Sequence, residues 1–135
     1  MVHALREAHR VLKPNGLLFD IRPGLKHRRV GLSRAGSWHV IGTMREKFED
    51  DRAANAAVAQ ILREGLFWRE WQMHLDLKRY LDTLKDLCAW LDEFSKLARH
   101  DWLVKRVQHA LLKELGETKI VVRGPLEISV MRKIR

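Results

Sequence analysis

The chain has 135 residues, of which 46% are apolar and 32% charged, and this composition is typical of one globular domain. No apolar run approaches the roughly 20 residues that cross a bilayer, and the charged amino end predicts no signal peptide. The single cysteine, Cys88, excludes an intrachain disulfide framework and a cysteine-based zinc module. It predicts a reducing compartment, the cytoplasm, and no membrane partner is expected.

The net charge is +9, from 26 basic and 17 acidic residues, and a charge of this size attracts polyanions. No acidic residue lies between Asp20 and Glu46, and this region holds the densest basic stretch: Arg22, Lys26, His27, Arg28, Arg29 and Arg34. The carboxyl end adds Arg132, Lys133 and Arg135. We interpret residues 22–34 as a solvated basic loop. Nucleic-acid binding is the alternative, but the sequence has no zinc finger, RNP aromatic pattern or GxxG clamp.

In the first half of the chain, the apolar pattern predicts a helix at residues 2–13, short strands at 17–21 and 37–41, and a second helix at 43–64. Pro14-Asn15-Gly16 ends the first helix, and the apolar run that follows is typical of a strand buried on both faces, as in a parallel sheet. Thr43-x-x-Glu46 is a capping-box pattern for the second helix, and Gly65 is placed to be its C-cap glycine.

In the second half, the pattern predicts a strand at residues 67–78, then a helix that starts at residue 83 and another at 101–116. Two further strands are predicted at 119–123 and 126–134. Alternation predicts that one face of the first strand is buried: Phe67, Trp71, Met73, Leu75 and Leu77. Thr83-x-x-Asp86 is a second capping box, and it precedes a helix with the apolar face Leu84, Leu87, Cys88, Leu91 and Phe94. Asp101 could cap the last helix, whose inward residues are Leu103, Val107, Ala110, Leu111 and Leu115.

These elements predict one domain over residues 1–135, of mixed helix and strand. The fold class is α/β (mixed α+β), with three to five strands of mixed direction and four helices. The sequence has neither GxGxxG nor GxxxxGK[ST], so it contains no glycine-rich phosphate loop. It also lacks HExxH and CxxC, and no two of its seven histidines are spaced i, i+4. We therefore predict no metal site and leave the catalytic residues unknown.

A few side chains are weak candidates for chemistry or contact. Asp20 and Asp76 fall near predicted strand ends, where catalytic carboxylates often lie, although turn or edge carboxylates are the simpler interpretation. Cys88 is predicted to be a buried thiol, and His9 a core or interface histidine rather than a general base. Among the tryptophans, the strand phase places Trp71 inward, whereas Trp68 and Trp90 fall on outer faces and are candidates for a subunit interface.

Residues 5–18, which read LREAHRVLKPNGLL, resemble a segment of class I S-adenosylmethionine-dependent methyltransferases. In that family a helix ends in an R-x-L-K-P-G-G turn that leads into the fifth strand of a Rossmann-like sheet. Asn15 replaces the first glycine, and asparagine also tolerates left-handed turns. Residues 65–67 and the strand after them are similar to the family's sixth strand, and 80–87 to the helix start that often follows. The resemblance implies that the last strand is the seventh, antiparallel between the fifth and the sixth.

The resemblance also implies what this sequence lacks. The family binds its cofactor through a glycine-rich loop after the first strand, an acidic residue after the second and contacts after the fourth. None of these maps onto a residue here, so no cofactor-binding residue is assigned. The chain resembles the carboxyl-terminal half of a methyltransferase domain, a partial Rossmann-like sheet. Its strand at 17–21 would then be an exposed apolar edge, which predicts a homodimer, or pairing with a complementary chain, through residues 17–21 and the first helix.

Three functions remain open from the sequence. The first is a methyltransferase-like protein, or a truncated methyltransferase, that assembles through its sheet edge and is not catalytic alone. The second is an active methyltransferase completed by a missing amino-terminal half, for which S-adenosylmethionine is the implied cofactor. The third is a basic adaptor that binds nucleic acid or an acidic partner.

Overall fold

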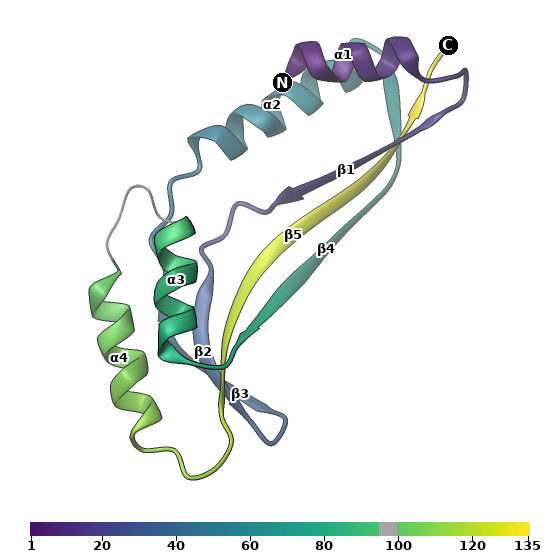
Figure 1. Ribbon diagram of the computed structural model, residues 1–135. Coiled ribbons are helices and arrows are strands. Elements are labelled where there is room, and N and C mark those ends of the chain that lie inside the picture. The colour runs from purple at the N-terminus through teal and green to yellow at the C-terminus, as the bar shows by residue number, and fades with distance from the viewer. Residues whose placement is uncertain (95–99) are drawn as a thin grey trace. The chain divides into compact units, whose positions relative to one another are not determined.

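The computed structural model describes residues 1–94 and 100–135, and that part of the chain has the predicted mixed α+β class (Figure 1). Its helices are α1 (Val2–Val11), α2 (Glu49–Arg63), α3 (Leu84–Phe94) and α4 (Asp101–Leu111). Its strands are β1 (Leu17–Pro23), β2 (Arg29–Arg34), β3 (Ser37–Thr43), β4 (Phe67–Leu81) and β5 (Lys119–Lys133). They form one antiparallel sheet of order β1-β5-β2-β3, in which β4 also pairs with β5.

The chain divides into two compact units that share the long strands β4 and β5. Unit 1 consists of Met1–Leu25, Lys47–Leu75 and Pro125–Arg135, and unit 2 of Lys26–Glu46 and Asp76–Gly124. Unit 1 therefore contains α1, β1 and α2, and unit 2 contains β2, β3, α3 and α4. Because two strands run through both units, this division does not decide whether residues 1–135 are one domain, which stays a prediction.

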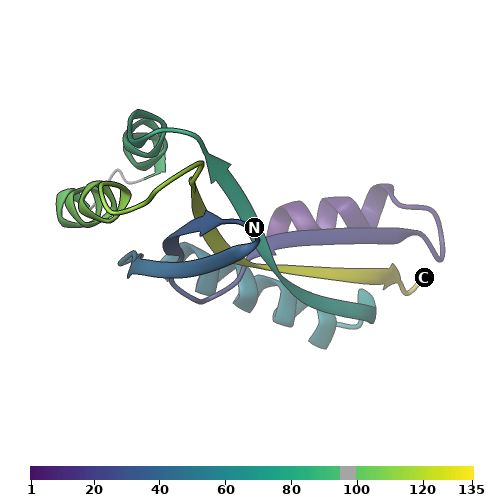
Figure 2. The same ribbon diagram turned by 90° about the horizontal axis from the view of Figure 1, so that it is seen from below.

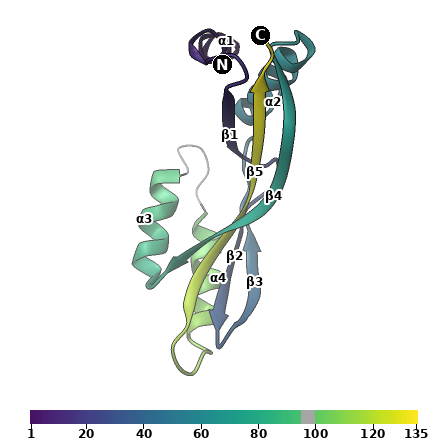
Figure 3. The ribbon, with the colours of Figure 1, turned by 90° about the vertical axis from the view of Figure 1, so that its right-hand side faces the viewer.

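In unit 1, β5 lies between β1 and β4 (Figure 3). It runs antiparallel to β1, from the pair Leu17↔Arg132 to the pair Pro23↔Leu126. The last strand of the chain thus lies between the strands that begin at 17 and 67, as the resemblance implies. Helices α1 and α2 pack against one face of these strands (Figure 2), and the buried residues between them are Leu5, Ala57, Val58, Ile61, Phe67 and Met131.

Unit 2 has its own apolar core beneath α3 and α4. Strands β2 and β3 form an antiparallel hairpin, and β2 also pairs with β5 from Arg29↔Arg123 to Ser33↔Lys119. Helices α3 and α4 pack side by side (Figure 2). Helix α4 also packs against β2 and β3. The buried residues are Val30, Leu32, Met44, Leu87, Leu91, Leu103, Val107, Ile120 and Val122.

Two strand predictions were wrong in their boundaries. The expected basic loop at 22–34 is largely strand, because β1 extends to Pro23 and the apolar Val30 and Leu32 anchor β2 in the core. The two strands expected at 119–123 and 126–134 are the single strand β5. Pro125 has no N–H to donate, but its carbonyl accepts the Gly24 N–H at 2.9 Å just after β1 has ended. The proline therefore lies where the neighbouring strand is interrupted, which is where a sheet tolerates it.

The helix signals were of unequal value. The box Thr43-x-x-Glu46 starts no helix, because Thr43 ends β3 and the Glu46 carboxylate accepts the Arg28 N–H at 2.6 Å. The Thr83-x-x-Asp86 box is confirmed, since each side chain accepts the other residue's N–H, at 3.1 and 3.0 Å. Gly65 is confirmed as the residue that ends α2, with φ +70° and its N–H donated to the Leu62 carbonyl.

The last helix is shorter than the sequence indicates. Helix α4 ends at Leu111 rather than at Gly116, and Leu115 is 80% exposed instead of inward. On α3, Leu87 and Leu91 are buried as predicted, and Cys88 is half-buried. The expected inward side chain of Phe94 lies outside the part that the structure describes.

Candidate functional site

The turn that leads into β1 is built by the residues that carry the family resemblance. Residues Lys13–Gly16 form a β-turn, closed by a hydrogen bond from the Gly16 N–H to the Lys13 carbonyl at 2.9 Å. Pro14 occupies its second position and Asn15 its third, where φ is +62°. A type II turn requires this left-handed geometry and accepts asparagine as well as glycine there. The departure from the family pattern at Asn15 therefore fits the turn.

Side chains of β5 fasten this turn to the sheet. The Lys133 ammonium donates to the carbonyls of His9 and Leu12, at 2.6 and 2.8 Å, and so satisfies the free end of α1. The Arg132 guanidinium donates to the Asn15 carbonyl at 2.8 Å. Arg132 and Lys133 near the carboxyl end thus have structural partners, and β1 begins in a fixed register.

Strand β1 has one free edge. It pairs with β5 on one side only, and no other described strand pairs with it. Its odd-numbered side chains point away from the helices, so that Phe19 is 63% exposed and Ile21 59% exposed. The prediction that this run is buried on both faces was wrong, because α1 and α2 cover the same face (Figure 2).

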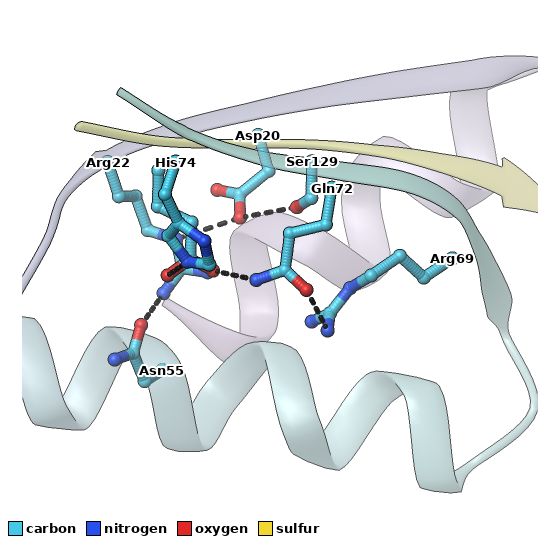
Figure 4. A network of polar contacts seen from close by, with 8 residues as sticks. Asp20, Arg22, Asn55, Arg69, Gln72, His74 and Ser129 are labelled. Atoms are coloured by element: carbon cyan, nitrogen blue, oxygen red, sulfur yellow. Dashed lines mark hydrogen bonds and ion pairs between the residues drawn. The ribbon is translucent and has the colours of Figure 1, made fainter. Parts of the chain in front are cut away.

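The same uncovered face continues onto β5 and β4. Phe19 and Ile21 pair with Val130 and Ile128 of β5, and paired residues lie on the same face of a sheet. On β4, Gln72 and His74 point toward α2 (Figure 4), so their neighbours Trp71 and Met73 point to the other face and are exposed. We call this set the outer face of unit 1: Phe19, Ile21, Trp71, Met73, Ile128 and Val130.

The predicted burial of alternate residues on β4 was therefore wrong after its first residue. Phe67 is buried among the helices, yet Gln72 and His74 also face them. Regular alternation would place positions 67 and 72 on opposite faces, so the alternation is interrupted once between them. This interruption turns Trp71 outward, against the prediction, and leaves it 46% exposed.

The inner face of the same strands carries a network of charged and polar side chains (Figure 4). Its centre is Arg22, which donates to Asp20 at 2.8 Å, lies 3.6 Å from Glu127 and also donates to Asn55 of α2. The side chains of Asp20 and Arg22 are only 9% and 11% exposed. Ser129, fully buried, donates to Asp20 at 3.3 Å. The network thus joins β1, β5 and α2, and it favours one strand register, because Asp20 pairs with Ser129 and Arg22 with Glu127.

The network reaches solvent at His74. Its Nε2 lies 3.3 Å from Glu127, whose other oxygen accepts a hydrogen bond from Gln72 at 2.8 Å. A histidine held by a carboxylate is the arrangement of a general base. The His74 side chain is, however, 69% exposed, and no described serine, threonine or cysteine hydrogen-bonds to it. The geometry supports a structural polar layer rather than a catalytic dyad.

The structure separates the two carboxylates singled out in the sequence. Asp20 belongs to the network of unit 1, whereas Asp76 belongs to unit 2 and pairs there with Arg29 and Arg123, at 3.3 and 3.0 Å. His9 has a structural role, with Nε2 3.3 Å from the Ile134 carbonyl and its ring edge-on to Phe67. Both aspartates thus have arginine partners, and neither is left free for chemistry.

The other sequence candidates have mixed outcomes. Trp68 is 50% exposed, as its outer phase predicts. Trp90 instead packs against the core of unit 2, which makes it a poor candidate for an interface. Glu127 and Asn55, which complete the network around Arg22, were missed because nothing local in the sequence marks them.

Most of the basic stretch is neutralised within the chain. Arg22 pairs with Asp20, Arg28 with Glu46, Arg29 with Asp76 and Arg34 with Glu114. The solvated basic surface expected at 22–34 is thus largely a series of ion pairs, with the neighbouring Asp20 and with three acidic residues that are distant in the sequence.

No protein-family model matches the sequence, and no curated protein matches it either. In the described part of the chain no helix is long and apolar enough to cross a membrane. The residues described also contain no group of three histidine, cysteine or acidic side chains placed to hold a metal ion. The features of unit 1 that bear on function are the open edge of β1 and the two sheet faces beside it.

Proposed function

We propose that residues 1–135 form a methyltransferase-like half domain that assembles into a homodimer through the free edge of β1. The observation that carries this proposal is the edge itself, an unpaired strand with exposed Phe19 and Ile21. An apolar edge strand of this kind is a template for pairing with another chain. In this proposal the dimer forms in the cytoplasm and does not catalyse methyl transfer on its own.

The strand order supports the methyltransferase-like part of the proposal. The resemblance places the family's seventh strand antiparallel between the fifth and the sixth. In this chain the corresponding last strand, β5, lies between β1 and β4. The turn at Pro14–Gly16 adopts a geometry that suits both the family's glycine and Asn15. Two independent features, one local and one topological, are therefore those expected from the resemblance.

The character of the outer face supports a second copy as the partner. Its six residues are apolar, and Arg132, which pairs with Leu17 at the end of β1, is bonded to Glu70. Two copies can therefore approach here without bringing unpaired charges together. Pairing of β1 with β1 of a second copy also closes the assembly at two chains, because the interface is the same surface on both.

The residues that the structure describes do not fit S-adenosylmethionine, the cofactor implied by the resemblance. The positive-φ glycines Gly36, Gly65 and Gly116 lie in three separate turns, so they form no common loop around a ligand. Asp20 and Glu127 are the carboxylates at β1, and both face Arg22 inside unit 1. We therefore assign no cofactor contact to this chain and derive no transfer step from it.

The test is the mass of the full chain in solution, measured by light scattering at tens of micromolar. We expect about twice the chain mass of 15.9 kDa. The double variant Phe19→Lys/Ile21→Lys places two charges on the edge strand and should be a monomer. The matched control Leu112→Lys/Leu115→Lys changes two exposed leucines of unit 2, and it should remain a dimer.

Hydrogen exchange separates pairing through the edge from packing through the face. Strand pairing protects the backbone amides of residues 17–22 that point to the free edge, so their exchange should slow as the protein concentration rises. A monomeric wild-type chain would overturn the proposed dimer. A dimer that persists in the Phe19→Lys/Ile21→Lys variant would place the interface elsewhere.

Calorimetric titration with S-adenosylhomocysteine tests the cofactor statement separately. We expect no binding by the dimer. Micromolar binding would show that a cofactor site exists without the family's glycine loop. It would favour the alternative of an active methyltransferase, whatever the mass measurement shows.

A further inference from the structure

A second surface, entirely within unit 2, is a cleft of about 460 Å³ between β3 and α4. Its apolar part is formed by Val40, Ile41 and Ala110. Ile41 and Ala110 also pack against the core of unit 2, whereas Val40 is 44% exposed. A cleft of this size with an apolar floor is in the range that accommodates a small organic group.

The rim of the cleft is basic. Lys105 and His109 are four residues apart on α4, and Lys113 follows four residues later, just past the end of the helix at Leu111. All three line the cleft along one stripe, and Arg106 lies beside them. The one acidic residue of the lining, Glu114, is already 3.5 Å from Arg34. Within the described residues, no carboxylate pairs with Lys105, Arg106 or Lys113. The described residues therefore leave this positive charge uncompensated, in contrast to the basic stretch at 22–34.

An exposed aromatic ring lies at the start of the same stripe. Trp102 is 41% exposed, and the Arg106 guanidinium lies 5.9 Å from the centre of its ring. Gly42 of β3 makes room for this ring and for Leu103, since a Cβ atom there would come within 3.1 Å of the ring and 2.6 Å of the leucine. An indole and a guanidinium that share one surface form a platform on which a flat base can stack.

We propose that this cleft binds single-stranded nucleic acid, with phosphates along the stripe from Lys105 to Lys113 and bases on Trp102 and the apolar floor. Lys105 and Arg106 on α4 and Lys113 just past its end give three cations along the cleft, and successive phosphates of a nucleic-acid strand can contact them in turn. An acidic peptide would satisfy the cations but would gain little from an exposed indole beside an apolar floor. The combination of cations with an aromatic platform therefore favours nucleotides.

The experiment is fluorescence anisotropy of the full chain with a labelled single-stranded RNA of twelve nucleotides. Three contacting cations predict that Kd rises about 20-fold as salt increases from about 50 to 200 mM. A free mononucleotide should bind far more weakly than the strand, because it engages one cation of the stripe. If the mononucleotide binds as tightly as the RNA, the proposal that the cleft binds a nucleic-acid strand is overturned.

The variant Lys105→Glu/Lys113→Glu should weaken RNA binding at least 10-fold. Its control, Lys26→Glu/Lys85→Glu, has the same net charge and changes two exposed lysines of unit 2 that lie outside the cleft. The control should retain binding within about 2-fold, which separates the cleft from the general charge of +9. Trp102→Ala should weaken binding about 5-fold or more through lost stacking.

Three further results would overturn the proposal. The first is no binding of RNA by the wild-type chain at low salt. The second is an equal loss of affinity in the cleft and control variants, which would make binding a matter of net charge. The third is tighter binding of a polyglutamate peptide than of RNA, with the same sensitivity to Lys105→Glu/Lys113→Glu. Circular dichroism of each variant confirms that it is folded before binding is measured.

Discussion

Strands β1 and β2 show that apolar sequence and burial are separate properties. β1 reads LLFDIRP and is the more apolar strand, yet Phe19 and Ile21 are exposed. β2 reads RVGLSR, with an arginine at each end, yet Val30 and Leu32 are fully buried. The difference lies in the neighbours: β2 pairs on both sides and lies in a core that α3 and α4 complete, whereas β1 pairs on one side only.

The two units also use arginine differently. In unit 1, Arg22 lies beneath the sheet, where Asp20, Glu127 and Asn55 satisfy it. In unit 2, Arg29 and Arg123 both bind Asp76, and their guanidinium carbons lie 5.2 and 4.4 Å from the centre of the Trp38 ring. Much of the positive charge of this chain therefore has a structural role, and net charge alone is a poor guide to a binding surface.

The largest expected effect tests the core of unit 2. Leu32→Ala removes a fully buried side chain and should lower the free energy of unfolding by about 3–4 kcal/mol. Leu112→Ala is the matched control, because Leu112 is 81% exposed, and its change should stay within about 0.5 kcal/mol. Urea unfolding measures both. Equal effects would contradict the assignment of β2 to the core.

Next in size is the polar layer of unit 1. Arg22→Met leaves Asp20 and Glu127 without their shared cation, and it should cost about 2–3 kcal/mol in urea unfolding. The triple variant Arg22→Met/Asp20→Asn/Glu127→Gln removes the unpaired charges as well and should recover part of that loss. A triple variant less stable than Arg22→Met would show that the carboxylates are stabilising in their own right.

A smaller effect compares the helix starts of the two units. Thr83 caps α3 in unit 2, and Thr83→Ala should cost about 1 kcal/mol. The sequence pattern at Thr43 is the same but forms no cap for α2 of unit 1, which begins at Glu49. Thr43→Ala should therefore change the free energy of unfolding by less than about 0.5 kcal/mol. Thermal unfolding of the two variants is the measurement, and a cost at Thr43 equal to that at Thr83 would contradict the structure.

The fold class and most elements could be predicted from sequence because local signals and packing agree there. Asn15, Gly65 and the Thr83–Asp86 box each have a geometry that their residue types require. The errors occur where a residue distant in the sequence determines the local structure. Glu46 binds Arg28 instead of starting a helix, and the single residue by which alternation slips in β4 reverses the face of Trp71.

The candidate site was predicted only in part, for the same reason. The free edge at residues 17–21 followed from the resemblance, because a sheet that consists only of the carboxyl-terminal half of the family's domain leaves this strand at its edge. The network around Arg22 could not be predicted, because Asn55 and Glu127 are brought to it from α2 and β5 by the fold. The basic cleft could not be predicted either, because its lining comes from α4 and β3, two elements far apart in the sequence. A spacing pattern on α4 alone gives only an exposed basic face.

The smallest expected effect tests an ion pair between the two helices of unit 1. Hydrogen bonds from Arg6 and Gln60 lower the pKa of Glu64 below its usual 4.5. A carboxylate with a lowered pKa in the folded state stabilises that state above its unfolded pKa, and this contribution is lost as the pH falls through the folded value. Glu64→Gln should therefore lower Tm by about 1–2 °C at pH 6, and the difference should shrink steadily as the pH falls below 4.5 and the carboxylate becomes protonated in the folded state. The control Glu93→Gln changes an exposed carboxylate of α3 that has no such ion pair within the described residues, and its Tm difference should stay constant over the same pH range. A Tm difference for Glu64→Gln that does not shrink as the pH falls would show that its cause is packing rather than charge.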